Sequence, residues 1–357
     1  MNIKNASFVN SKTLNILFLF FPVTFLMGNA VLNIHILLIA ITGIIFFKKE
    51  IFSFKKEKLL AVILIFFILV LVSTLIDISK DPKNDHFLKS ISYFRYFFLF
   101  LISSCLVKSG KFKIKYFLVS CLVCSLFLSL DIIYQFLNGS DIFGFVGYEG
   151  AAPHSGKDIY HLAGFLKNEY VAGGYIQKFF VFALILIPVI WKKLDKQKFL
   201  ISTILPIIFF SGILFSGNRM PLVMFCVSIL LMIILIKELR LSLAIASLFC
   251  VLIFTITMKM NDNLRGYYIS FYQNSSHVIA VMKKYIPKKY PELEKNKEKK
   301  CIEKDNDVYC EHFYQQSKKL KSRYEEIPSF GSGHLVIYLT AIDIWIDNPI
   351  IGNGIKS

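Results

Sequence analysis

Charged residues are scarce in this sequence. Only 18% of the 357 residues are Asp, Glu, Lys or Arg, and acidic residues number 24 against 41 basic ones. Soluble domains of this size carry nearer 25% charged residues, so the composition excludes a soluble enzyme. It also excludes a disordered chain, which would combine low hydrophobicity with high charge. Seven cysteines in so long a chain exclude a small disulfide scaffold.

Motifs that carry common chemistry are also missing. We find no glycine-rich phosphate loop, no metal-ligand spacing and no Ser-His-Asp arrangement, and therefore predict no metal and no cofactor. Cys121 and Cys124 lie in an apolar run without His or carboxylate neighbours, which indicates packing. The basic residues form no groove with interleaved aromatics, so nucleic-acid binding is not predicted. The seven histidines are scattered: His35, His86, His154, His161, His277, His312 and His334.

Long apolar runs are what the sequence has in abundance. Hydrophobic residues make up 55% of the chain, Phe alone occurs 36 times, and the mean hydropathy is +0.58. A helix needs about 20 residues to cross about 30 Å of hydrocarbon. The chain therefore predicts an all-α integral membrane protein whose residues 1–258 form a bundle of about nine transmembrane helices. The nine stretches are 14–28, 31–47, 59–76, 91–107, 116–137, 171–191, 199–215, 221–236 and 241–258.

Basic residues gather in alternate connections between these stretches. The N-terminus and the segments 48–58, 108–115, 192–198 and 237–240 together hold seventeen Lys or Arg and only four acids. This bias predicts that these segments lie in the cytoplasm, with the N-terminus inside, and that they contact anionic lipid headgroups. The connections between them, and everything after Met258, are then external.

Residues 259–357 form the largest predicted external region. It carries 16 basic and 12 acidic side chains, with a Lys- and Glu-rich middle at 283–326. The apolar pattern at 333–346 is typical of a helix at the bilayer interface. Cys301 and Cys310, the two cysteines of this region, allow a disulfide in an oxidising compartment, although a cysteine beyond Ser357 is an equally acceptable partner.

Two arginines lie at predicted external ends of helices. Arg219 stands at the tip of the turn Ser216-Gly217-Asn218-Arg219, where it either anchors the chain to headgroups or binds an anion. Arg265 follows the ninth stretch, and taken alone it is expected to be a solvated residue that flanks the membrane span. Together they predict a vestibule that neutralises a pyrophosphate held at the membrane interface.

Other polar residues lie within or beside the apolar stretches. Asp131 is a carboxylate inside the fifth stretch, four residues before Gln135, and Arg95 in the fourth is its predicted partner. Neutralisation of this pair and a direct substrate role both remain open. Glu169 precedes the sixth stretch, where an acidic side chain favours a helix N-terminus.

Four segments together resemble the O-antigen ligase and polymerase family of bacterial envelope assembly. They are Asp131-x3-Gln135-x3-Gly139-x-Asp141-x2-Gly144, the run 165–175 around Asn168-Glu169-Tyr170, Ser216-Gly217-Asn218-Arg219, and Asn348-Pro349 with Gly352-x-Gly354. Each motif is weak alone, but their order and spacing cover most of the chain.

The resemblance implies a multi-pass glycosyltransferase of the GT-C type in the bacterial inner membrane. Such enzymes move a glycan from an undecaprenyl pyrophosphate carrier to an acceptor at the periplasmic face, without a metal or cofactor. The acceptor is lipid A-core in ligases, another glycan repeat in polymerases and a protein hydroxyl in related enzymes. Arg219 and Arg265 would stabilise the pyrophosphate leaving group.

The chain departs from the family at its end. A histidine-bearing segment and further spans follow Gly352-x-Gly354 in the family, whereas this sequence stops at Lys356-Ser357, which predicts a truncated chain. His334 is the substitute candidate for the catalytic base. The alternatives are a lipid-linked oligosaccharide flippase or transporter, disfavoured by the external region and the lack of internal repeats, and an inactive fragment acting as a scaffold.

Overall fold

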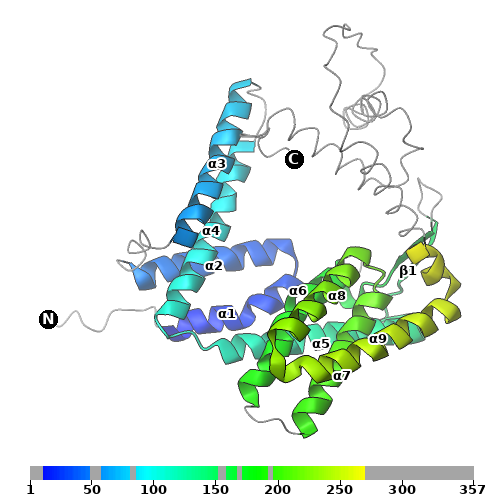
Figure 1. Ribbon diagram of the computed structural model, residues 1–357. Coiled ribbons are helices and arrows are strands. Elements are labelled where there is room, and N and C mark those ends of the chain that lie inside the picture. Colours follow the sequence, from blue (N-terminus) through cyan, green and yellow to red (C-terminus); the bar gives the residue numbers. More distant parts are fainter. Residues whose placement is uncertain are drawn as a thin grey trace, which may run out of the picture. The chain divides into compact units, whose positions relative to one another are not determined.

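The computed structural model describes residues 11–48, 58–80, 86–151, 158–166, 171–191 and 196–269. Within these ranges the chain is almost entirely helical, and each predicted apolar stretch coincides with one α-helix (Figure 1). The helices are α1 (Ser11–Leu26), α2 (Asn29–Phe47), α3 (Lys58–Lys80), α4 (His86–Lys108), α5 (Ile114–Asn138), α6 (Ala172–Ile190), α7 (Lys196–Phe215), α8 (Arg219–Leu235) and α9 (Arg240–Met260).

A small hairpin interrupts the helical pattern between α5 and α6. Strand β1 (Tyr148–Ala151) pairs antiparallel with β2 (Asp158–His161), and the 3₁₀ turn η3 (Gly164–Leu166) follows. The sequence analysis predicted an external connection here but no strands. A second 3₁₀ turn, η4 (Lys237–Leu239), joins α8 to α9.

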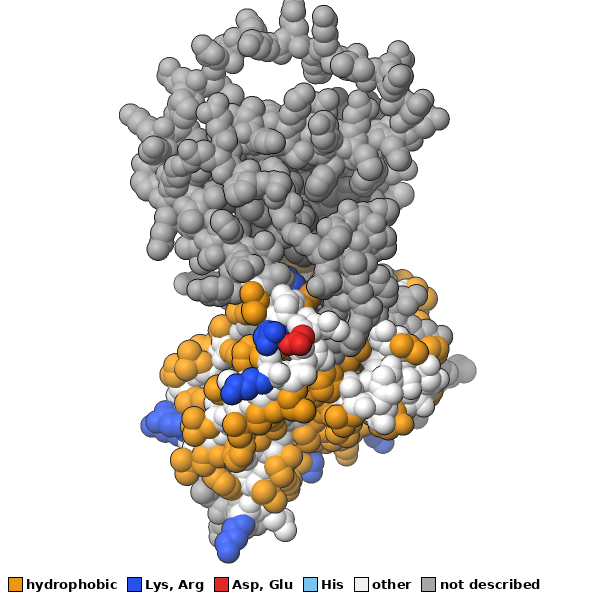
Figure 2. Space-filling model, turned by 90° about the vertical axis from the view of Figure 1, so that its right-hand side faces the viewer, with side chains coloured by type: hydrophobic (Ala, Val, Ile, Leu, Met, Phe, Trp, Pro, Cys, Tyr) orange, Lys and Arg blue, Asp and Glu red, His pale blue; other side chains and the backbone are white. Residues whose placement is uncertain are grey.

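Among the described residues, six helical segments are long and apolar enough to cross a membrane. They belong to α2, α4, α5, α6, α7 and α9, whereas α1, α8 and the apolar part of α3 are shorter. Hydrophobic side chains cover much of the face in Figure 2, as expected for helices that meet lipid. The protein is therefore a multi-pass helical membrane protein, while the nine crossings and their orientation stay predictions.

Two compact units divide the chain, residues 1–67 with 92–268 and residues 68–91 with 269–357. In the first unit, α5 packs against α1, α6 and α7. A Cβ at Gly212 of α7 would lie only 2.9 Å from the Cα of Ser129 on α5, so glycine allows these two backbones to approach closely. In the second unit, the Ser90 hydroxyl donates a 2.6 Å hydrogen bond to the Thr74 hydroxyl, which joins α4 to α3.

An ion pair between a buried lysine and a half-exposed glutamate lies at the predicted cytoplasmic end of the first unit. The ammonium of Lys198 lies 2.6 Å from a Glu238 carboxylate oxygen and donates to the Trp191 carbonyl at 3.0 Å. The Lys198 side chain is 2% exposed and that of Glu238 is 54% exposed. The pair therefore ties the start of α7 to the end of α6 and to η4.

Glu238→Gln should destabilise the protein, because it leaves a buried ammonium without its counter-charge. We expect a loss of about 1–3 kcal/mol, seen as a lower melting temperature in detergent micelles. Lys237→Gln, which changes an exposed neighbour in the same turn, is the matched control and should change little. Equal melting temperatures for the two variants would contradict a stabilising role for the pair.

Candidate functional site

The turn between α7 and α8 is packed tightly enough to fix Arg219. The Ser216 side chain is fully buried, and its hydroxyl donates to the Ile213 carbonyl at 2.7 Å. Asn218 donates its side-chain amide to the Ser216 hydroxyl at 3.0 Å. A Cβ at Gly173 of α6 would collide with the Ser216 hydroxyl, so the turn rests directly on the start of α6.

Arg219, the first residue of α8, lies on an aromatic ring. Its Cζ is 3.5 Å from the ring centroid of Tyr267, a geometry that stabilises a guanidinium by cation–π attraction. Burial raises the pKa of Tyr267 more than the Arg219 charge lowers it, so this phenol is neutral at pH 7. The neighbouring Tyr268 donates to the Leu214 carbonyl at 3.3 Å, which joins helical residues 262–269 to α7.

His161 lies beside the same tyrosine. It ends β2, where it pairs with Tyr148, and its ring centroid is 5.7 Å from that of Tyr267 in an edge-to-face arrangement. Burial lowers the pKa of His161, and the positive charge of Arg219 lowers it further, against an opposing backbone hydrogen bond with Ser216. The imidazole is therefore neutral at pH 7. We name His161, Arg219 and Tyr267 the His–Arg–Tyr cluster.

Sequence reasoning found Arg219 but missed the other two members of this cluster. In the sequence, His161 is one of seven scattered histidines, and Tyr267 is a near neighbour of Arg265. No local motif marks them, because three segments far apart in sequence bring them together. The one available signal was that all three fall in connections predicted to be external.

Asp131 holds the connection between α5 and α6 instead of pairing with Arg95. Its side chain is 2% exposed, and its two carboxylate oxygens accept the N–H groups of Ile142 at 3.1 Å and Phe165 at 2.8 Å. The predicted Asp131–Arg95 pair is wrong. Arg95 donates to the Ser92 carbonyl and lies over the ring of its neighbour Tyr96.

Gln135, one turn after Asp131, holds the same connection. Its side-chain oxygen accepts the Gly164 N–H at 2.9 Å, and its amide nitrogen donates to the Phe145 carbonyl at 3.0 Å. Asp141 accepts the N–H groups of Phe143 and Phe145 within the connection itself. Asp131, Gln135 and Asp141, which we call the loop clip, therefore fix the loop that carries His161.

Arg265 pairs with a residue outside the His–Arg–Tyr cluster. It forms a 2.8 Å ion pair with Asp262, and the two side chains are 51% and 80% exposed. The structure thus supports Arg219, rather than both arginines, as a fixed cationic centre. Glu169, His334, Cys301 and Cys310 lie outside the described residues.

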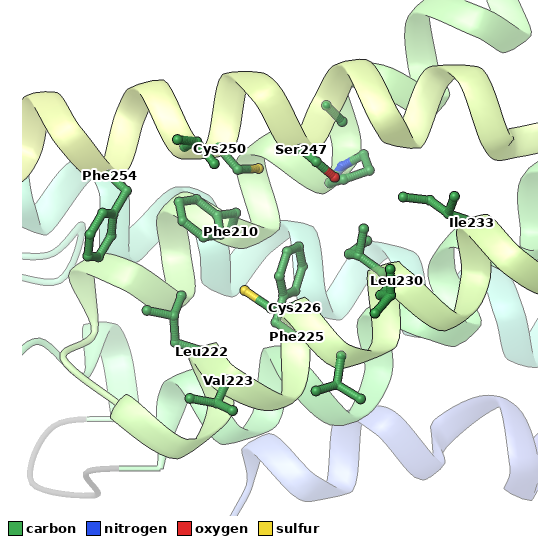
Figure 3. Close-up of a pocket in the computed structure, with 15 residues that line it drawn as sticks. Phe210, Leu222, Val223, Phe225, Cys226, Leu230, Ile233, Ser247, Cys250 and Phe254 are labelled. Carbon is green, nitrogen blue, oxygen red and sulfur yellow. The ribbon is translucent and has the colours of Figure 1, made fainter. Parts of the chain in front are cut away.

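An apolar groove of about 670 Å³ runs between α7, α8 and α9 (Figure 3). Ser247, Cys250 and Phe254 of α9 face Cys226 and Leu222 of α8 across it. The helical rise places the lining residues of α8, from 222 to 233, over about 16 Å.

No member of the His–Arg–Tyr cluster lines this groove, but two of its lining residues are neighbours of the cluster. Leu222 follows Arg219 by three residues, which is about one turn of α8, so both lie on neighbouring parts of the same helix face. The Phe254 ring, on the opposite wall, lies 6.1 Å from the ring of Tyr268. The site therefore combines a fixed cation with an extended apolar channel.

Comparison with protein families, curated proteins and solved structures found no match for this chain. The resemblance to the O-antigen ligase and polymerase family stays a prediction.

Proposed function

We propose that this protein transfers a glycan from an undecaprenyl pyrophosphate carrier to a hydroxyl acceptor at the external face of the bacterial inner membrane. The observation that carries the proposal is the position of Arg219, which lies on Tyr267 about one helical turn before Leu222, a residue that lines the apolar groove. The acceptor is lipid A-core or another glycan repeat. Arg219 and the groove fit the two halves of the carrier.

The chemistry of the donor matches both halves of the site. A polyprenyl tail requires an apolar site, and the groove between α7, α8 and α9 is lined almost entirely by apolar side chains. A pyrophosphate requires a cation that offers paired N–H donors, which a guanidinium supplies. As the glycosidic carbon separates from the carrier, negative charge grows on the phosphate oxygen next to Arg219, and this charge is stabilised there.

The decisive experiment is deletion of the gene in its own bacterium, followed by extraction of lipid-linked glycans. A transferase predicts that the undecaprenyl pyrophosphate-linked glycan accumulates on the external face and that the mature surface glycan is lost. Accumulation on the cytoplasmic face would favour a flippase instead. Unchanged donor and product would contradict both functions and leave the scaffold interpretation.

A tryptophan in the groove should exclude the carrier's tail. We expect Ser247→Trp to weaken binding of undecaprenyl pyrophosphate by about tenfold, because a bulky ring fills apolar space that the tail would occupy. The control is Leu248→Trp, which adds the same ring at a neighbouring position that is 72% exposed and points away from the groove. Binding is measured as the rise in melting temperature with added carrier. Equal losses in both variants would argue against tail binding here.

A further inference from the structure

His161 is held in place from two sides. The pairing of β2 with β1 fixes its backbone, and the loop clip fixes the residues that follow, because Gly164 and Phe165 bond to Gln135 and Asp131. Gly164 adopts a φ of +55°, and a Cβ there would lie 2.5 Å from the Asp131 carboxylate. The imidazole is therefore carried by a rigid part of the loop, as precise chemistry requires.

The His161 ring and the Arg219 guanidinium meet the same tyrosine. Arg219 lies over the face of Tyr267, while His161 approaches that ring edge-to-face with an interplanar angle of 75°. The two side chains thus belong to one site although 57 positions separate them in sequence, and His161 also bonds to the backbone of Ser216, three residues before Arg219. We therefore expect a group bound at Arg219 to lie close to His161.

We propose that His161 is the general base that activates the acceptor hydroxyl. This role rests on the proposed function. An imidazole nitrogen of His161 takes the proton of the acceptor O–H as that oxygen forms a bond to the glycosidic carbon of the donor. The bond from that carbon to the phosphate oxygen breaks, and undecaprenyl pyrophosphate leaves as an anion next to Arg219. The proton on His161 then passes to solvent.

The groups that face His161 keep it in the form that accepts a proton. Burial and the positive charge of Arg219 on α8 oppose protonation, and Tyr267 of residues 262–269 presents a neutral ring, while the hydrogen bond with the Ser216 backbone acts in the opposite direction without outweighing them. Because the pKa of His161 lies below its ordinary value of 6.5, the base form dominates at neutral pH. The rate should fall only as the pH drops below about 6.5, where the imidazole becomes protonated.

The test uses the full-length protein in detergent and the lipid-linked glycan extracted from the deletion strain as donor. His161→Ala should lower the transfer rate by about 10²–10⁴-fold, the usual contribution of a general base. Binding of undecaprenyl pyrophosphate should stay within twofold of the wild type. Added imidazole should restore part of the lost rate, and the fall in rate at acid pH should disappear. Val146→Ala, at a position that is 79% exposed in the same loop, is the control.

Three results would overturn this role. The first is a His161→Ala variant that keeps more than a tenth of the wild-type rate. The second is loss of carrier binding in parallel with the rate, which shows a structural contribution. The third is a His161→Ala variant whose rate is not restored by imidazole and still falls at acid pH as the wild-type rate does. A wild-type protein that binds the carrier but transfers no glycan instead overturns the proposed function, and the role of His161 with it.

Discussion

Arg219→Ala is expected to lower the rate of glycan transfer by about 10²–10³-fold, the range seen when one fixed donor to a developing oxyanion is removed. The Arg219 Cζ lies 3.5 Å from the centroid of the Tyr267 ring, and this contact holds the guanidinium in place before the leaving group forms. The same change should weaken undecaprenyl pyrophosphate binding, because the ground-state pyrophosphate carries most of that charge already. Transfer is measured with donor from the deletion strain, and binding by the shift in melting temperature.

Arg219→Lys separates charge from geometry. Lysine retains the positive charge but loses both the paired N–H donors and the flat face that lies on Tyr267. We therefore expect it to recover binding better than rate. Arg265→Ala is the matched control, since Arg265 is exposed and pairs with Asp262 at 2.8 Å. An Arg219→Ala protein as active as Arg265→Ala would remove the main support for the proposed function.

The helices could be predicted from the sequence because their cause is local. A run of about 20 apolar residues must satisfy its own backbone hydrogen bonds in lipid, and an α-helix does this within the segment. The stretch predicted at 116–137 is α5, Ile114–Asn138, and the one predicted at 199–215 is the apolar part of α7, Lys196–Phe215. The breaks at 216–220 and 237–240 were equally visible as short polar or basic interruptions.

The candidate site was only partly predictable. Arg219 was found because a cation in a short external turn is conspicuous in an apolar sequence. Asp131 was conspicuous for the same reason, but its partners are backbone N–H groups, which no side-chain pattern reveals. His161 reaches Arg219 through the pairing of β1 with β2 and through Tyr267, and such non-local contacts leave no periodicity in the sequence.

This difference between Arg219 and His161 follows from how each is supported. Arg219 directly follows a turn of three residues between two helices, so its surroundings are close to it in the chain. His161 depends on a loop whose attachment begins 30 residues earlier, at Asp131. Any change that frees the loop should therefore affect His161 before it affects Arg219.

Asp131→Ala is expected to free this loop, with a loss of about 1–3 kcal/mol in stability as two partly buried N–H groups lose their acceptor. Asp131→Asn should be intermediate, because the amide keeps one acceptor oxygen and presents a donor in place of the other. The control is Asp262→Ala, which removes an exposed carboxylate whose ion pair contributes little. Melting temperature reports the loss in stability, and hydrogen exchange locates it.

The residues whose amide hydrogens exchange faster in this variant show whether the loop clip fixes the loop. In Asp131→Ala, faster exchange should be confined to residues 139–166, with α7 and α8 unchanged, because the carboxylate bonds only to N–H groups of that loop. Transfer should then fall towards the level of His161→Ala while carrier binding, which depends on Arg219 and the groove, persists. Uniformly faster exchange across α5, α6 and α7 would instead show that Asp131 stabilises the packing of the helices. Loss of carrier binding in the same variant would show that the loop is part of the binding site.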